Sequence, residues 1–156
     1  MTKTGPEKGV HDDGALEAVR GLARVLRILE RSSHELSMPH YRVLASVAAG
    51  EERASRVAER LELGRPAISS AVEALCARGF MERREVVGDQ RAFDLRVTPE
   101  GVAVLQRVEH EMTEALRALC ARVEGSEQLL KSLATLDGAV DAMFAAKRAA
   151  REGAPQ

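Results

Sequence analysis

Residues 55–79 read SRVAERLELGRPAISSAVEALCARG, and this stretch decides the fold. Apolar residues recur at helical spacing on both sides of Leu63-Gly64, which is typical of a turn. Ser55 is expected to cap the first helix, and Arg65-Pro66 suits the start of the second because proline loses no hydrogen bond there. Gly79 is expected to end the second helix. The stretch predicts a helix-turn-helix, which presents the N-terminal end of its second helix to the DNA major groove.

Two further helices are expected before this stretch. The first runs from about Asp13 to His34, because apolar residues recur there three and four positions apart. The second opens at Ser37-Met38-Pro39, where proline fits the first helical turn, and it ends at Gly50.

A β-hairpin is expected directly after the helix-turn-helix. Residues 80–86 and 91–97 predict two short strands, and residues 87–90 are rich in turn formers. Alternation places Phe93, Leu95 and Val97 on one face and Asp94 on the other. A hairpin at this position is a wing, the second DNA-contacting part of a winged helix-turn-helix.

Two long helices are expected to complete the chain. Thr98-Pro99-Glu100 combines a cap residue, a first-turn proline and an early carboxylate, so it is a strong helix start. Apolar residues then recur every three to four positions as far as Glu124, with the spacing of a coiled-coil seam. Gly125-Ser126 interrupts the pattern, and a last helix follows it, with Gly138 near its middle.

The predicted fold is mainly α with a small β-hairpin (α+β), a winged helix-turn-helix with flanking dimerisation helices. Residues 1–12 are expected to be a disordered lead, residues 37–98 the DNA-binding domain, and residues 13–36 and 99–150 the helical dimerisation region. The apolar stripes of the flanking helices are too long for one small domain to cover. A second copy of the chain would cover them in a two-fold dimer, and the alternative is a monomeric helix bundle.

Charge, composition and missing motifs limit the classes of function that the sequence can have. Formal net charge is −1, whereas residues 53–96 hold nine Arg against seven Asp or Glu, a local net of +2. No stretch is apolar enough for a membrane span or a signal peptide, and two cysteines form no disulfide framework, so a cytoplasmic protein is expected. The sequence has no metal-ligand spacing, nucleophile elbow or glycine-rich phosphate loop. We therefore expect no metal, no cofactor and no enzymatic activity.

Several segments resemble the multiple-antibiotic-resistance regulator (MarR) family. Residues 36–44 are similar to the opening of that family's second helix, and residues 57–66 to its third helix and the start of its recognition helix. Residues 75–83 resemble the end of the recognition helix and the first strand. The most specific match is the wing signature, Asp89-Gln90-Arg91 followed by residues 98–101. The resemblance implies a homodimer that binds a pseudo-palindromic DNA operator, usually as a repressor.

The candidate DNA contacts lie at the recognition-helix start and in the wing. Arg65 suits a phosphate or a guanine, and a small Ala67 suits close approach to a thymine methyl. An arginine at the wing tip can enter a narrow minor groove, and a neighbouring Asp89 can orient it. Family members commonly have Thr at position 67, Arg at 70 and an apolar residue at 94, so the base preference here is its own. The predicted contacts are Arg65, Pro66, Ala67, Ser69, Ser70, Asp89 and Arg91.

The effector is open at this stage. Many relatives release DNA when a small anionic aromatic ligand binds between the dimer helices and the winged domain. The candidates at that junction are His34, His40, Tyr41 and Arg42. The simpler interpretation is that these are surface residues at helix ends and that Tyr41 belongs to the core.

Two alternatives stay open beside a small-molecule effector. One is a redox response through Cys76, because this residue lies on the apolar side of the recognition helix. Burial would instead make both Cys76 and Cys120 inert. The other alternative is a helical adaptor that binds no DNA, and the charged hairpin argues against it.

Overall fold

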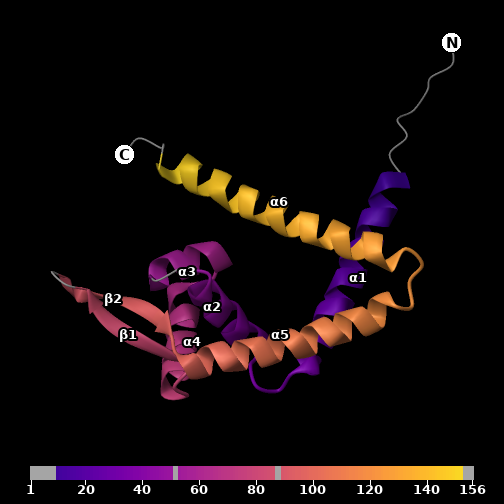
Figure 1. The fold of residues 1–156 in the computed structure, drawn as a ribbon. Coiled ribbons are helices and arrows are strands. Elements are labelled where there is room, and N and C mark those ends of the chain that lie inside the picture. The colour runs from indigo at the N-terminus through magenta and orange to yellow at the C-terminus, as the bar shows by residue number, and fades with distance from the viewer. Residues whose placement is uncertain (1–9, 51–52, 87–88, 153–156) are drawn as a thin grey trace, which may run out of the picture.

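Residues 37–98 fold into three short helices and a two-stranded hairpin, and long helices lie on one side of this winged part (Figure 1). The structure is a computed structural model and describes residues 10–50, 53–86 and 89–152. The elements are α1 (Val10–Ser32), α2 (Met38–Ala48), α3 (Ala54–Leu61), α4 (Arg65–Ala77), β1 (Met81–Val86), β2 (Asp89–Val97), α5 (Pro99–Cys120) and α6 (Ser126–Glu152). The mainly helical fold with a small hairpin is the one that the sequence predicts.

The helix-turn-helix is confirmed, with one correction at its start. The Val57 N–H donates to the carbonyl of Arg53 at 3.1 Å, which makes Arg53 the N-cap of α3. Ser55, the predicted cap, instead lies exposed in the first turn. Glu62 ends α3 in the left-handed conformation with φ of 50°, and the Leu63 N–H donates to Ala58. This tight turn leads directly into α4.

The recognition helix α4 begins and ends where the sequence predicts. Gly64 is its N-cap, and Pro66 occupies the first turn. At the other end Gly79 has φ of 75°, and the Phe80 N–H reaches back to the Leu75 carbonyl at 2.9 Å. The positive φ explains the glycine, because an L side chain rarely adopts that conformation.

The hairpin is antiparallel, and its register pairs Met81 with Val97. β2 begins at Asp89, two residues earlier than predicted, and residues 87–88 of the predicted turn lie outside the described part. The expected face also needs a correction, since Leu95 is buried but Phe93 is 42% exposed. Only the base of the hairpin packs on the core, and Phe93 lies beyond it.

The start of α5 is locked against the end of the recognition helix. As predicted, Thr98 caps α5, and its Oγ1 accepts a hydrogen bond from the Gly101 N–H at 3.0 Å. The Thr98 hydroxyl also donates to the Gly79 carbonyl at 2.6 Å, and its N–H donates to the Phe80 carbonyl at 3.1 Å. A Cβ on Gly101 would lie 2.0 Å from the Phe80 carbonyl oxygen. This junction therefore fixes α5 relative to the wing.

The bounds of the long helices differ from the predicted ones. α1 begins at Val10, so residues 10–12, predicted to be disordered, are helical, because helices extend past their apolar stripe. α5 ends at Cys120 and not at Glu124, because the next backbone N–H groups bond three residues back and tighten the last turn. α6 continues through Gly138.

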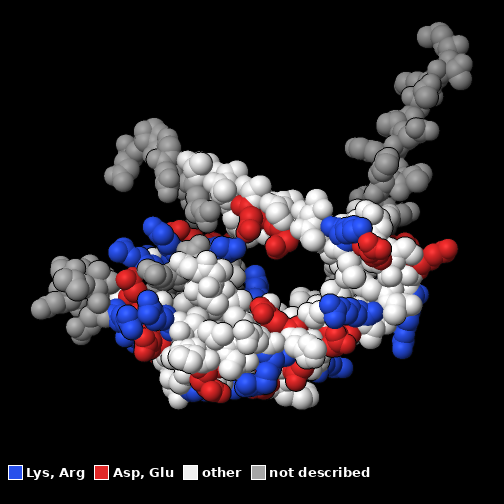
Figure 2. Space-filling view, in the orientation of Figure 1, with Lys and Arg blue, Asp and Glu red and all other residues white. Residues whose placement is uncertain are grey.

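One chain leaves much of its apolar surface uncovered. Figure 2 shows an opening through the molecule, bounded on one side by α6, which Figure 1 shows crossing above α5. Among the described residues, no helix is both long and apolar enough to cross a membrane. The large exposed apolar residues of α1 and α6 are Leu16, Val19, Leu22, Leu26, Ile28, Leu129, Leu136, Val140 and Met143.

Candidate nucleic-acid interface

The first two turns of α4 have one exposed face and one buried face. Ile68, Ala71, Val72 and Leu75 face the core, and all four are buried. The buried side fixes the rotation of the helix, so the other side is held toward solvent. The five α4 residues predicted to contact DNA are exposed and share this outer side: Arg65, Pro66, Ala67, Ser69 and Ser70.

The start of α4 has the electrostatics of an anion-binding site. The Ala67 and Ile68 N–H groups donate to the Gly64 carbonyl at 3.0 and 3.2 Å, and the positive end of the helix dipole lies at this point. Arg65 adds a full charge beside it and borders a small cleft against Ser55 of α3. A DNA phosphate is the kind of group that such a terminus can hold.

The wing places its predicted contacts at its distal end. The backbones of Asp89 and Arg91 belong to β2, and their side chains lie outside the described part of the structure. Asp94 lies on the strand face opposite Leu95, as predicted, and its Oδ1 is 3.8 Å from Nε of Arg53. Figure 2 shows Lys and Arg side chains gathered around the winged part, interspersed with carboxylates.

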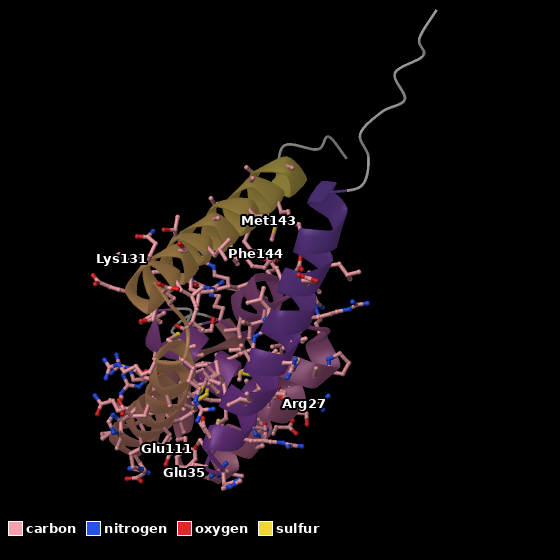
Figure 3. All side chains as sticks on the ribbon, turned by 90° about the vertical axis from the view of Figure 1, so that its right-hand side faces the viewer. Arg27, Glu35, Glu111, Lys131, Met143 and Phe144 are labelled. Carbon is pink, nitrogen blue, oxygen red and sulfur yellow. The ribbon has the colours of Figure 1, made fainter. Side chains whose placement is uncertain are left out.

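A bidentate ion pair joins the α1–α2 connection to α5. Nε and Nη2 of Arg107 each donate to one carboxylate oxygen of Glu35, both at 2.8 Å. This hydrogen bonding is the main reason that the pKa of Glu35 is lowered from its usual 4.5, and the charge of Arg78 at the end of α4 adds to it. Figure 3 shows Glu35 at one end of α1, beside α5. The sequence analysis did not identify this pair, because its residues are 72 positions apart.

The C-terminal half of α6 contacts the helix-turn-helix. Arg60 Nη2 lies 3.2 Å from Asp141 Oδ1, and Lys147 donates to a carboxylate oxygen of Glu62. Phe144 lies between these two pairs on the side of α6 that faces α3, and it lines a cleft of about 380 Å³ (Figure 3). These contacts also escaped the sequence analysis, because periodicity does not reveal which helices meet.

Of the four residues predicted to bind a ligand, one lines a cleft in the structure. A cleft of about 390 Å³ opens between α1, α2 and α5, and of the four only Tyr41 lines it. His34 and Arg42 are exposed, and Nδ1 of His40 lies 3.0 Å from the hydroxyl of Ser37 at the start of α2. Burial, then the charges of Glu109 and Asp137, raise the pKa of Tyr41. Of these two carboxylates, Glu109 also lines the cleft.

The two cysteines are largely removed from solvent. Burial raises the pKa of the Cys76 thiol, and the charge of Arg83 offsets this only in part. Cys120 is fully buried at the end of α5. A protonated, half-buried thiol reacts slowly with oxidants, so this environment does not favour the redox response.

The fold and the exposed α4 face define a winged-helix transcription regulator. Residues 34–92 match the MarR family, and no curated protein matches the chain. A MarR-family regulator from Rhodococcus sp. RHA1 is 19% identical with a TM-score of 0.71, covering 86% of this chain and 96% of its own. CouR from Rhodococcus jostii RHA1, bound to p-coumaroyl-CoA, is 20% identical with a TM-score of 0.66, covering 86% and 96%. PcaV from Streptomyces coelicolor, with its natural ligand, is 27% identical with a TM-score of 0.60, covering 92% and 99%. The chain is therefore similar to the MarR family in sequence over residues 34–92 and in fold over most of its length.

Proposed function

We propose that this protein is a homodimeric repressor that binds a pseudo-palindromic DNA operator in the cytoplasm. It is a binding protein and not an enzyme. The observation that carries the proposal is the exposed N-terminal face of α4, which a buried opposite face holds in place and a hairpin wing flanks. In this arrangement the recognition helix enters the major groove, and the two half-sites lie about one DNA turn apart.

Each predicted contact has a distinct role at this face. Arg65 binds a phosphate or a guanine at the positive end of α4. Ser69 and Ser70 have short side chains whose hydroxyls donate hydrogen bonds to phosphates or base edges. Ala67 and Pro66 allow the backbone to approach the bases closely. In the wing, Arg91 enters the minor groove and Asp89 orients it.

The homodimer is supported by the long helices. α1 and α6 carry exposed leucines and valines that one chain does not cover, and α6 borders the opening in Figure 2. A second copy would bury these side chains around a two-fold axis. The dimer would also place two α4 helices for the two half-sites.

We also propose that a small aromatic effector releases the DNA. PcaV was solved with its natural ligand and CouR with p-coumaroyl-CoA, so ligand binding occurs on this fold. In this chain the cleft that Tyr41 lines with Leu29 and Met112 offers an aromatic and apolar surface between the long helices and the winged part.

Fluorescence anisotropy tests DNA binding directly. The probe is labelled DNA from upstream of the protein's own gene, compared with a scrambled duplex near 150 mM salt, since affinity depends steeply on salt. Arg65→Ala and Arg91→Ala should each weaken binding by roughly 1–3 kcal/mol without unfolding the protein. Arg122→Ala is a matched control, because Arg122 lies in the exposed α5–α6 connection, far along the chain from the winged part. Equal affinity of all three variants and the parent would contradict the proposed interface.

A further inference from the structure

The guanidinium of Arg83 lies over an exposed aromatic ring of the wing. Its Cζ lies 4.9 Å from the centroid of Phe93, across the two strands of the hairpin. Arg83 pairs in register with Leu95, so it follows the strand face that packs on the core at the base of the hairpin. Stacking uses the flat face of the guanidinium and leaves its N–H donors at the edge available to a ligand.

Core packing does not account for Phe93. The ring is 42% exposed, while Leu95, two residues nearer the core, is buried. A large apolar side chain in water contributes little to stability, so burial does not explain a phenylalanine at this position. The contact of its ring with the guanidinium of Arg83 does explain it. The ring restricts the rotamers of a long, flexible arginine and thereby directs its charge.

Arg83 has no ion-pair partner among the described side chains, in contrast to the arginine on the opposite face of the hairpin. Among side chains that the structure describes, no carboxylate lies within ion-pair distance of Arg83. On the opposite face, Nε of Arg84 is 3.1 Å from Oε1 of Glu82, and Asp94 lies near Arg53. On that face both Glu82 and Asp94 therefore have an arginine beside them, whereas Arg83 has no carboxylate beside it among the described side chains.

Arg83 also lies in the angle between the wing and the recognition helix. β1 packs against α4, and the charge of Arg83 acts on the thiol of Cys76 in that helix. When α4 enters a major groove and the wing enters the neighbouring minor groove, one sugar–phosphate backbone of the DNA separates the two grooves. That backbone passes through the angle between the wing and α4, where Arg83 lies.

We propose that Arg83 binds a DNA phosphate between the two grooves and that Phe93 is the residue that positions it. This inference rests on the proposed function, since it requires the protein to dock on duplex DNA. A phosphate contact carries no sequence information, so its effect is the same on every DNA sequence.

The salt dependence of DNA binding distinguishes this role from a structural one. Arg83→Ala should weaken binding to the upstream duplex and to the scrambled duplex alike, by about tenfold, and should lower the salt slope by about one unit for each bound subunit. Arg84→Ala is the matched control, because it removes an arginine from the neighbouring position that Glu82 already neutralises. Its affinity and slope should stay near those of the parent protein.

Phe93→Leu tests the positioning role. It keeps the charge, so the salt slope should be unchanged while affinity falls by about threefold, and it should have no further effect in an Arg83→Ala background. An Arg83→Ala protein that melts like its parent and retains its affinity and slope would overturn this inference alone. Absence of any DNA binding by the parent protein would overturn both this inference and the proposed function.

Discussion

The winged part and the long terminal helices use their apolar residues in opposite ways. The core cluster runs from Leu36 to Val108, and within the winged part it contains fully buried side chains such as Leu44, Val57 and Leu75. All but two of the large exposed apolar residues lie instead in α1, in α6 or in the segment before α6. Most apolar side chains of the winged part are buried within one chain. The apolar side chains of α1 and α6 stay exposed and need a further surface to cover them.

Two glycines provide the strongest test of this comparison. Gly101→Ala should destabilise the protein by at least about 4 kcal/mol, because its Cβ would lie 2.0 Å from the Phe80 carbonyl oxygen and backbone cannot yield cheaply. Gly138→Ala should stabilise it by about 0.5–1 kcal/mol, because alanine favours helix and the added Cβ would meet nothing within 4 Å beyond the neighbouring backbone of its own helix. Chemical denaturation measures both changes, and similar effects at the two positions would remove the distinction.

Two leucines test it at a smaller magnitude. Leu75→Ala should cost about 2–5 kcal/mol of unfolding free energy at any protein concentration, because this side chain is fully buried in one chain. Leu136 is 54% exposed, so Leu136→Ala should change the stability of the isolated chain by less than about 0.5 kcal/mol. If a second copy covers α6, the same variant should weaken self-association, measured by analytical ultracentrifugation. A large loss for Leu136→Ala in a monomeric sample would be inconsistent with the comparison.

The Glu35–Arg107 ion pair, which links the α1–α2 connection to α5, should give the smallest effect and a defined pH dependence. The pKa of Glu35 is lowered in the folded protein, so its contribution is present above the unfolded pKa near 4.5 and lost as pH falls through the folded pKa. Glu35→Gln should therefore lower Tm at pH 6 and have a diminishing effect toward pH 3. In an Arg107→Gln background this pH-dependent difference should disappear. A constant difference across the range would assign the effect to packing.

Local signals in the sequence were sufficient for the elements themselves. Gly79 and Thr98 mark real ends because one residue type meets a backbone requirement at each of them. The prediction for Ser55 was wrong. The first backbone hydrogen bond of α3 joins the Val57 N–H to the Arg53 carbonyl, so the helix begins before Ser55 and this residue cannot serve as its cap. Phe93 was misplaced for a different reason, since alternation gives the face of a strand but not where the core stops.

The site was predictable only where neighbours in sequence are neighbours in space. The exposed face of α4 follows from helical spacing, so Arg65 and Ser69 were found. The Glu35–Arg107 pair and the contact of Phe144 with α3 depend on how distant helices pack, which no local pattern encodes. The same limit explains why His34 and His40 were grouped with Tyr41 and yet do not share its cleft.

The ion pairs between the end of α3 and α6 also give their packing specificity and direction. Along α3 the charges run positive at Arg60 and negative at Glu62, and along α6 they run negative at Asp141 and positive at Lys147. A helix laid on α3 in reverse order would bring like charges together, which is costly. The order of the charges therefore favours α6 in one direction along α3. Exchanging the charges within both pairs at once would keep the attraction between these two helices and would disfavour a helix with the original charges.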